Sequence, residues 1–308
     1  MQAVVYKSTG NWYQVKTQEG EWLKARLKGK LKLEGITSTN PVAVGDEVNI
    51  EREAGDDSIV ITGIHTRKNY INRISPHNRN QHHIVASNLD QSLLFATLKH
   101  PKTSLGFIDR FLVISEAYHV PAIIVYNKID LLKPAELELL EEYTEMYRSV
   151  GYRVIQASIT THAGVDELME ALHHKTTLLS GHSGVGKSTF INYLFPELNI
   201  KTKEVSGWSG KGLHTTTFAE MYDLPKGGRI IDTPGIREMG LVDISKQELS
   251  HYYPEMRAVI SGCHYNNCLH TDETHCAVKD AVARGDIHEE RYINYLKMLD
   301  TIEAPKYS

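Results

Sequence analysis

A glycine-rich segment in the middle of the chain restricts the possible folds more than any other feature. Gly181-His182-Ser183-Gly184-Val185-Gly186-Lys187-Ser188 matches the phosphate-binding pattern G-x-x-x-x-G-K-[ST] without a mismatch. Residues 177–180 before it suit a buried strand, and residues 189–195 after it suit a helix. A strand, such a turn and a helix N-terminus together surround a polyphosphate with N–H groups. We therefore expect an α/β nucleotide-binding domain, with Lys187 at the β- and γ-phosphates and Ser188 at Mg²⁺.

An upstream motif indicates which base is recognised. Asn127-Lys128-Ile129-Asp130 follows residues 122–126, an apolar run that is typical of a buried strand. The Asp130 carboxylate can accept hydrogen bonds from the ring N–H and the amine of guanine, whereas adenine would leave this carboxylate unpaired. Such mismatches discriminate strongly between ligands. We expect Asn127 to tie this loop to the phosphate loop and the Lys128 stem to cover the base.

Three further segments complete the expected nucleotide site. Ala157-Ser158 follows a strand-like run, where a backbone N–H could meet the guanine carbonyl. Asp232-Thr233-Pro234-Gly235 suits an aspartate that reaches Mg²⁺ through water and a glycine amide at the γ-phosphate. His214-Thr215-Thr216-Thr217 offers candidates for the threonine that closes over the metal; Thr216 is our choice, and nothing excludes its neighbours. Ser188, Thr216 and Asp232 are thus expected at magnesium. The expected nucleotide contacts are Asn127, Lys128, Asp130, Ala157, Ser158, Gly181, His182, Ser183, Gly184, Val185, Gly186, Lys187, Ser188, Thr189, Thr216, Asp232 and Gly235.

The order of these motifs is unusual. In ordinary small GTPases the phosphate loop comes first and the guanine-reading loops come last, whereas here the guanine loops precede the phosphate loop. We predict a circularly permuted domain, which is physically tolerable because domain termini often lie close together at the surface. The loops would still converge beyond the carboxyl ends of the strands. The segment from Asp232 onward then leads directly into the C-terminal region.

All three cysteines fall in one window near the C-terminus, with the spacing C-x₄-C-x-H-x₅-C. Three thiolates and one imidazole form a closed tetrahedral set, which is typical of structural rather than catalytic zinc. An odd number of cysteines argues against a disulfide framework. His264 and His275 are nearby alternatives for the imidazole position. The expected ligands are Cys263, Cys268, Cys276 and one imidazole, and the spacing alone leaves the choice among His270, His264 and His275 open.

The N-terminal part reads as a small β-barrel. Its strand-like runs are residues 3–6, 12–15, 22–33, 46–50 and 58–64, which suits a five-stranded OB-fold. Side chains alternate along a strand, so the third run places apolar residues on one face and positive residues on the other. The positive row has two open interpretations, a track for RNA phosphates or a solvated face that protects an edge strand. The row consists of Lys24, Arg26, Lys28, Lys30 and Lys32.

The length of 308 residues is compatible with two or three domains. We predict a barrel over residues 1–68, a nucleotide domain over 69–240 and a zinc-binding domain over 241–308, with residues 69–81 as a polar connector. The formal net charge of −4 requires any RNA contact to come from local patches. No apolar run approaches a membrane span and no secretory signal is present, so we expect a cytoplasmic protein without a membrane partner.

The combined motif order resembles the RsgA (YjeQ/YloQ) family of circularly permuted GTPases. The resemblance spans nearly the whole chain, including the stretch 108–112. It implies a multidomain fold with an N-terminal OB-fold, a permuted α/β GTPase domain and a mainly helical C-terminal zinc-binding domain. By the same resemblance His270 is the imidazole ligand of zinc. It further implies a bacterial factor in late maturation of the 30S ribosomal subunit, which binds the subunit and its 16S rRNA and hydrolyses GTP to GDP when the subunit stimulates it.

Two positions bear on activity. Leu213 stands where the family often carries a positive charge, which weakens any RNA or phosphate contact there. Ile236 stands where many GTPases carry a water-orienting glutamine, so intrinsic hydrolysis should be slow. We expect the subunit to order residues 207–217 and to bring His214 to the attacking water; the alternative is a structural switch role for His214. The rival classes are an RNA-binding module with a structural nucleotide and a metabolic P-loop kinase. We expect a monomer.

Overall fold

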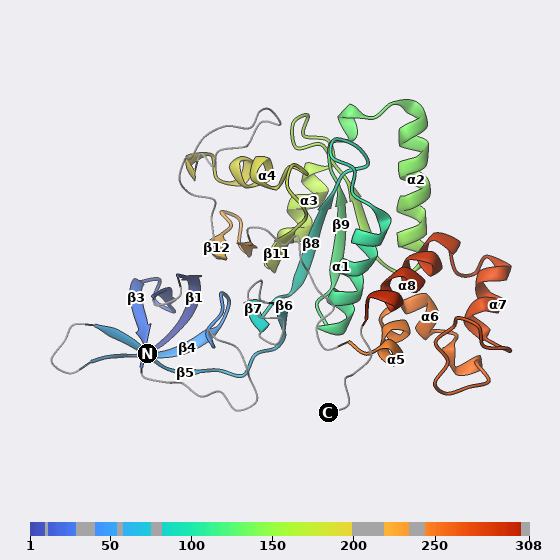
Figure 1. Ribbon diagram of the computed structural model, residues 1–308. Helices are drawn as coiled ribbons and strands as arrows, with labels where there is room; N and C mark the ends of the chain where they lie inside the picture. The colour runs from blue at the N-terminus through green and yellow to red at the C-terminus, as the bar shows by residue number, and fades with distance from the viewer. Residues whose placement is uncertain are drawn as a thin grey trace, which may run out of the picture.

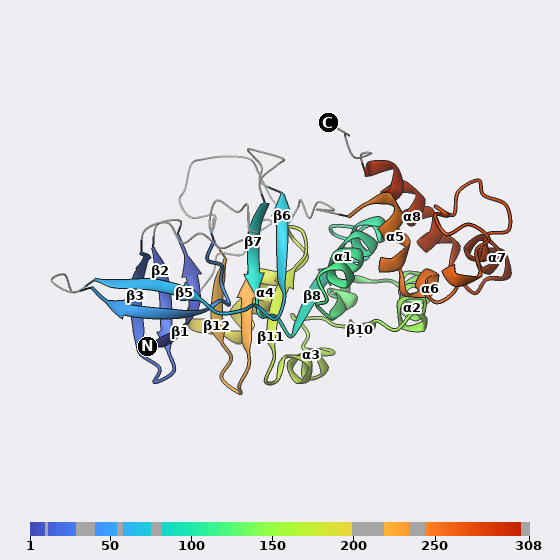
Figure 2. The ribbon, with the colours of Figure 1, turned by 90° about the horizontal axis from the view of Figure 1, so that it is seen from below.

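The computed structural model describes residues 1–9, 12–28, 41–53, 58–74, 82–198, 219–233 and 244–302 of the chain. Three regions follow one another: an N-terminal barrel, a central α/β layer and a C-terminal group of helices (Figure 1). Figure 2 shows the three in a row, with the α/β layer in the middle. None of the helices within the described ranges is long and apolar enough to cross a membrane.

The barrel consists of β1 (Gln2–Ser8), β2 (Tyr13–Thr17), β3 (Trp22–Leu27), β4 (Glu47–Arg52) and β5 (Ile59–Ile64). The strand order is β1-β2-β3-β5-β4, and β4 pairs back onto β1, which closes the barrel. The five predicted strands are confirmed. However, the third ends at Leu27 and not at the predicted position 33; the positions beyond 28 lie outside the described residues.

Strand alternation builds the barrel interior. Val5, Val15, Ala25, Ile50 and Ile61 are fully buried and belong to one apolar cluster. The intervening residues of β2 and β3 face outward, because successive side chains of a strand point to opposite faces. The predicted alternation of β3 is therefore confirmed for the residues that the strand contains.

The central sheet has the strand order β10-β9-β8-β11-β13-β12. All neighbours pair in parallel except β12 and β13, which are antiparallel. The first strand of the sheet in sequence, β8, lies in the interior of the sheet beside β11, the strand that leads into the phosphate loop. The strands are β8 (Gln91–Ala96), β9 (Ala122–Tyr126), β10 (Arg153–Gln156), β11 (Thr176–Ser180), β12 (Glu220–Asp223) and β13 (Arg229–Asp232).

Helices cover both faces of this sheet. One face packs against α1 (Leu105–Ala117) and α2 (Pro134–Ser149), and the other against α3 (Val165–Leu172) and α4 (Lys187–Leu194). Adjacent residues of one strand serve the two layers: Leu94 contacts the first cluster, whereas Leu93 contacts the second. Two short 3₁₀ helices, η1 (Ile129–Leu131) and η2 (Pro196–Leu198), follow β9 and α4.

The expected polar connector after the barrel is in part a β-hairpin. β6 (Tyr70–Ile74) pairs antiparallel with β7 (His82–Ser87), in a register that sets Tyr70 opposite Ser87. The prediction of a polar connector over residues 69–81 was therefore wrong for β6, which is a strand. The cause is Ile71, which is fully buried in the main core beside Ala86, whereas the sequence reading weighed only the polar residues around it.

The barrel and the central sheet are joined edge to edge. β12 pairs antiparallel with β1 at Lys7 and Glu220, so the two form one continuous 11-stranded sheet. The Lys7 ammonium lies 2.9 Å from the Glu220 carboxylate. Close by, the Tyr6 hydroxyl donates to Asp223 at 2.6 Å. The sequence did not indicate this seam, because neither strand carries a pairing motif.

The C-terminal region packs its helices against α1. Leu249, Tyr253, Val278 and Tyr295 are fully buried in one cluster, which also includes Val113 of α1. This region therefore shares its core with the central domain. Its elements are α5 (Lys246–Leu249), η3 (Ser250–Tyr252), α6 (Pro254–Arg257), η4 (Ile260–Gly262), α7 (Ala277–Arg284) and α8 (Glu289–Thr301).

Candidate nucleotide-binding and metal sites

The phosphate-loop motif forms the turn between β11 and α4. Gly181, Gly184 and Gly186 have φ values of 132°, 88° and 105°, which L-amino acids with a side chain rarely adopt. A Cβ on Gly186 would lie 2.1 Å from the side-chain amide nitrogen of Asn127, so the glycine also permits a close approach. Ser183 and Gly184 are exposed, Ser188 is half-buried and Thr189 is exposed at the start of α4. The loop is thus open to a ligand above the helix N-terminus.

The Lys187 ammonium folds back over its own loop. It donates to the carbonyl oxygen of His182 at 3.0 Å and to that of Gly181 at a shorter distance. These carbonyls hold the cation against the phosphate loop. Phosphate oxygens are stronger acceptors for an ammonium group than carbonyl oxygens, because charge-assisted bonds are roughly twice as strong. A bound polyphosphate would therefore replace these contacts.

The loop after β9 contacts the phosphate loop directly. The Asn127 amide donates to the carbonyl oxygen of Val185 at 2.8 Å, and its side-chain oxygen accepts from the N–H of Ile159 at 3.3 Å. Lys128 adopts a left-handed backbone conformation and donates to the carbonyl oxygen of Gly184 at 2.6 Å. One asparagine thus connects the guanine motif, the phosphate loop and the loop after β10.

Asp130 and the Ala157-Ser158 pair lie at the same edge of the sheet. Asp130 is exposed on η1, and the N–H of Ile129 donates to the Ala157 carbonyl at 3.3 Å. The N–H groups of Ala157 and Ser158 are already engaged, with Tyr126 and Ala163 respectively. A role for either N–H at the guanine carbonyl would require a change in this pairing.

Asp232 ends β13 directly beside the phosphate loop, since it pairs in register with Leu179 of β11. Burial raises the pKa of its carboxyl above the ordinary value, and the Lys187 ammonium acts in the opposite direction. A buried carboxylate near the phosphate position with this balance is suited to a divalent cation, which would compensate its charge. His214, Thr216 and Gly235 lie outside the described residues.

Sequence reasoning missed the loop between β8 and α1, which covers one side of the phosphate loop. Thr103 Oγ1 lies 2.7 Å from His182 Nε2, and the Phe107 ring meets the His182 ring edge-on with centroids 5.7 Å apart. The Lys128 ammonium donates to the His100 carbonyl at 2.8 Å. This loop contains no nucleotide motif, so only the tertiary contacts reveal it.

The predicted metal set is brought together. The ligand atoms of Cys263, Cys268, His270 and Cys276 all lie within 4.8 Å of one another. Cys263 Sγ lies 4.0 Å from Cys276 Sγ and 3.7 Å from His270 Nδ1. Zn–S bonds of about 2.3 Å in a tetrahedron separate two sulfurs by roughly 3.8 Å, so the spacing fits zinc.

Of the three candidate histidines, His270 is the one whose imidazole lies beside the cysteines. His270 is buried and lies in the cluster, whereas His264 and His275 are exposed and outside it. The Tyr292 hydroxyl donates to the His270 carbonyl at 2.6 Å, and the Tyr295 hydroxyl to the Leu269 carbonyl at 2.8 Å. Helix α8 therefore holds the segment that carries the histidine. These four residues suggest a structural zinc site, closed by its own ligands.

Only part of the positive row on the barrel lies within the described residues. Lys24, Arg26 and Lys28 are exposed, and Lys30 and Lys32 lie outside the described residues. Arg26 pairs with Glu53 at 2.6 Å, and Lys28 lies 3.8 Å from Glu51. The Lys24 ammonium lies 4.3 Å above the exposed Trp12 ring. The row is therefore a mixed surface, in which acidic neighbours offset two of the described charges.

The loops after β9 and β11 meet at the carboxyl edge of the sheet, beside the end of β13 at Asp232, in a permuted order. This geometry defines a circularly permuted P-loop GTPase with an N-terminal barrel and a C-terminal Cys₃His region. The chain matches the family profile of the RsgA GTPase over residues 64–242 and that of the RsgA N-terminal domain over residues 2–60. The chain belongs to the RsgA GTPase family.

Individual relatives agree over nearly full length. The chain is 49% identical to the small ribosomal subunit biogenesis GTPase RsgA of Flavobacterium psychrophilum, over 97% of this chain and 93% of the relative. It is 48% identical to the RsgA of Bacteroides fragilis, over 100% and 99%. Among solved structures, YjeQ from Thermotoga maritima superposes with a TM-score of 0.78 at 34% identity, covering 97% of both chains. The circularly permuted GTPase YloQ gives 0.74 at 28% identity, over 99% of this chain and 96% of that chain.

Proposed function

We propose that this chain hydrolyses GTP during late maturation of the 30S ribosomal subunit, and that the nucleotide state controls its affinity for the subunit and its 16S rRNA. The observation that best supports this proposal is the hydrogen bond from Asn127 to the carbonyl of Val185, because it joins a guanine-recognition motif to a phosphate-binding loop. The names of the relatives, small ribosomal subunit biogenesis GTPases, supply the biological setting. This role implies a cytoplasmic, monomeric factor.

We assign each nucleotide role from the motif to which the residue belongs. Asp130 would read the guanine edge, and Lys128 would cover the base. Lys187 would leave the carbonyl oxygens of its own loop for the β- and γ-phosphates. Ser188, Thr216 and Asp232 would hold Mg²⁺, which would neutralise phosphate charge, and the amide of Gly235 would contact the γ-phosphate. The remaining proposed contacts come from the loop backbone and its neighbours: Ala157, Ser158, Gly181, His182, Ser183, Gly184, Val185, Gly186 and Thr189.

Hydrolysis itself needs help from the subunit. Ile236 cannot orient water, so we propose that subunit binding brings His214 to the attacking water. Zinc at the four-residue cluster would fix the C-terminal region, which would then act as a docking surface. The barrel would contact rRNA phosphates through the row Lys24, Arg26, Lys28, Lys30 and Lys32.

We propose the following domain limits: barrel over residues 1–68, GTPase domain over 69–240 and zinc-binding domain over 241–308. Residues 69–81 remain in the second of these, because Ile71 is buried in the core of the GTPase domain.

Purified 30S subunits test the proposal. We expect the subunits to accelerate GTP hydrolysis and to bind the protein more tightly with a non-hydrolysable GTP analogue than with GDP, because a switch must bind differently in its two states. Equal affinity in both states would reduce the nucleotide to a structural role. Phosphoryl transfer to a small acceptor instead of water would assign the chain to the kinases.

A salt titration tests the barrel surface. Neutralising the five positive residues should weaken subunit binding and flatten its salt dependence, since each lost phosphate contact reduces counterion release. Unchanged affinity would leave the row as a solvated face. The matched control is the double variant Glu51→Gln and Glu53→Gln, which removes the offsetting acids and should strengthen binding.

A further inference from the structure

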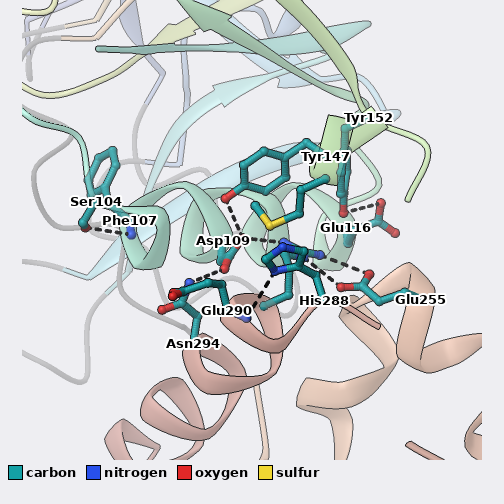
Figure 3. Close-up of polar contacts among 12 residues, drawn as sticks. Ser104, Phe107, Asp109, Glu116, Tyr147, Tyr152, Glu255, His288, Glu290 and Asn294 are labelled. Atoms are coloured by element: carbon teal, nitrogen blue, oxygen red, sulfur yellow. Dashed lines mark hydrogen bonds and ion pairs between the residues drawn. The ribbon is translucent and has the colours of Figure 1, made fainter. Parts of the chain in front are cut away.

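A buried group of polar residues joins the C-terminal region to the GTPase domain (Figure 3). Arg291 of α8 donates to Asp109 of α1 at 2.5 Å and to Glu255 of α6 at 2.8 and 3.1 Å. Asn294 donates to the other Asp109 oxygen at 2.7 Å, and the Tyr147 hydroxyl donates to Asp109 at 3.0 Å. We call these five residues the interdomain charge cluster.

The cluster fixes one orientation of α8 on α1. Arg291 and Asp109 are 1% and 0% exposed in their side chains, so water cannot replace a lost partner. Apolar packing tolerates small sliding movements, whereas hydrogen bonds to a buried carboxylate are satisfied in one register. Buried charged groups of this kind are known to specify geometry even where they add little net stability.

The N-terminal end of α1 contacts the phosphate loop. The Thr103 hydroxyl oxygen accepts from the Thr97 N–H at 3.0 Å, which leaves its own proton available for His182 Nε2 at 2.7 Å. Ser104 caps α1 by accepting from the Phe107 N–H at 3.2 Å. Phe107 touches the His182 ring and precedes Asp109 by two residues. One short helix therefore meets the phosphate loop in its first turn and the interdomain charge cluster in its second.

Nucleotide binding must alter the contacts of the phosphate loop that lie next to the start of α1. In the structure the Lys187 ammonium donates to the His182 carbonyl, and this contact competes with phosphate oxygens for the same cation. When Lys187 turns to a phosphate, the His182 peptide loses its charged partner. The imidazole of the same residue remains bonded to Thr103, so any shift of the loop reaches the cap of α1.

We propose that Thr103 is a positioning residue, which connects the phosphate loop through α1 and the interdomain charge cluster to the zinc-binding region. The proposal rests on the nucleotide assignment of the previous subsection. It gives the C-terminal region a second connection to the nucleotide, independent of the chain segment that leaves Asp232. Because α1 contacts the phosphate loop and the interdomain charge cluster within its first two turns, and these contacts are directional, binding at the loop biases the orientation of α8.

Hydrogen exchange of the full-length protein measures this connection. Peptides covering α8 are compared without nucleotide and with GDP, and GDP affinity is measured separately with a fluorescent analogue. We expect GDP to slow exchange in α8 of the wild type by roughly threefold or more. Thr103→Val should abolish most of this slowing while GDP still binds. His182→Ala removes the same link from the other side and should have the same effect in α8; because His182 is also a proposed nucleotide contact, this variant is compared at GDP concentrations that saturate it.

Thr17→Val is the matched control, because it also removes a hydroxyl that accepts a backbone N–H, at 3.2 Å, but lies in the barrel. It should behave as wild type. Full slowing of α8 in both Thr103→Val and His182→Ala would overturn the proposal, and so would an unresponsive α8 in a wild type that binds GDP. A wild type that binds no GDP would instead refute the nucleotide assignment and the proposal with it.

Discussion

The side-chain amide of Asn127 lies 2.8 Å from the carbonyl oxygen of Val185, a residue 58 positions later in the chain. The contact holds the base-reading loop against the phosphate-binding loop. It also requires Gly186 at the next position, because a Cβ there would collide with the Asn127 amide. The two motifs therefore form one site even though their order in the sequence is reversed.

Asp130 is the residue that should select guanine. Asp130→Asn exchanges an acceptor for a donor, so we expect GTP affinity to fall by roughly 10- to 100-fold, about 1.4 to 2.8 kcal/mol. Affinity for xanthosine triphosphate, which carries a carbonyl in place of the amine, should rise. Competition binding with a fluorescent nucleotide measures both. Asp300→Asn, an equally conservative change at an exposed site on α8, should alter neither.

A variant of His214 distinguishes its two possible roles, positioning the attacking water or acting as a structural switch residue. If it positions the attacking water, His214→Ala should leave GTP binding intact and lower subunit-stimulated turnover by about 10²- to 10⁴-fold. Single-turnover hydrolysis with saturating subunits measures this step apart from product release. Wild-type stimulation in the variant would remove His214 from catalysis.

Zinc should hold the C-terminal region together. Cys276→Ser removes a ligand, and we expect loss of the bound zinc together with faster hydrogen exchange across residues 244–302. Elemental analysis reports the metal directly. His275→Ala changes the neighbouring residue, whose side chain is exposed and outside the cluster, and should keep zinc. Equal zinc loss in both variants would refute the assigned ligand set.

The interdomain charge cluster should be sensitive to charge. Asp109→Asn leaves the buried Arg291 with a single carboxylate partner, and we expect a loss of about 3 to 5 kcal/mol, because one member of a buried pair is removed. Tyr147→Phe removes only one neutral donor to the same carboxylate and should cost about 1 kcal/mol. Denaturant unfolding compares the two. Equal effects would mean that packing, not charge, dominates this contact.

Replacing either of two aspartates by asparagine should change the melting temperature, and the two changes should have opposite signs. Burial raises the pKa of Asp232 in the folded protein, so the ionised carboxylate destabilises the nucleotide-free fold. This loss of stability grows as the pH rises from the pKa of Asp232 in the unfolded chain to its pKa in the folded protein. Asp232→Asn should therefore raise the melting temperature by about 2–4 °C per kcal/mol recovered, and should abolish the magnesium dependence of nucleotide binding.

Asp223 supplies the contrast. Burial alone would raise the pKa of Asp223, but hydrogen bonds from Lys16 and Tyr6 outweigh it and the net shift is downward. Its ionised form is therefore stabilising above the unfolded pKa, and Asp223→Asn should lower the melting temperature at neutral pH. A rise in both variants would contradict the opposite signs of the two shifts.

Most of what could be predicted about the fold and the site came from local sequence motifs. The strands before each loop, the glycine turn and the three cysteine positions of the metal set follow from short segments, whose chemistry can be recognised without tertiary contacts. Choosing His270 over His264 and His275 from the residues alone was impossible, because burial decides it. The role of Asp109 was equally hidden, since Arg291 lies 182 positions away and no pattern links them. The β6 strand was missed because one buried isoleucine, Ile71, outweighs its polar surroundings.

The strand pair that joins β1 to β12 has a practical consequence. Without the barrel, β12 would present an open row of unpaired N–H and carbonyl groups, a template on which other chains can assemble. A truncated chain that begins at β6 should therefore be prone to self-association even if its nucleotide pocket is intact. The barrel thus protects the solubility of its neighbour, whatever else it contacts.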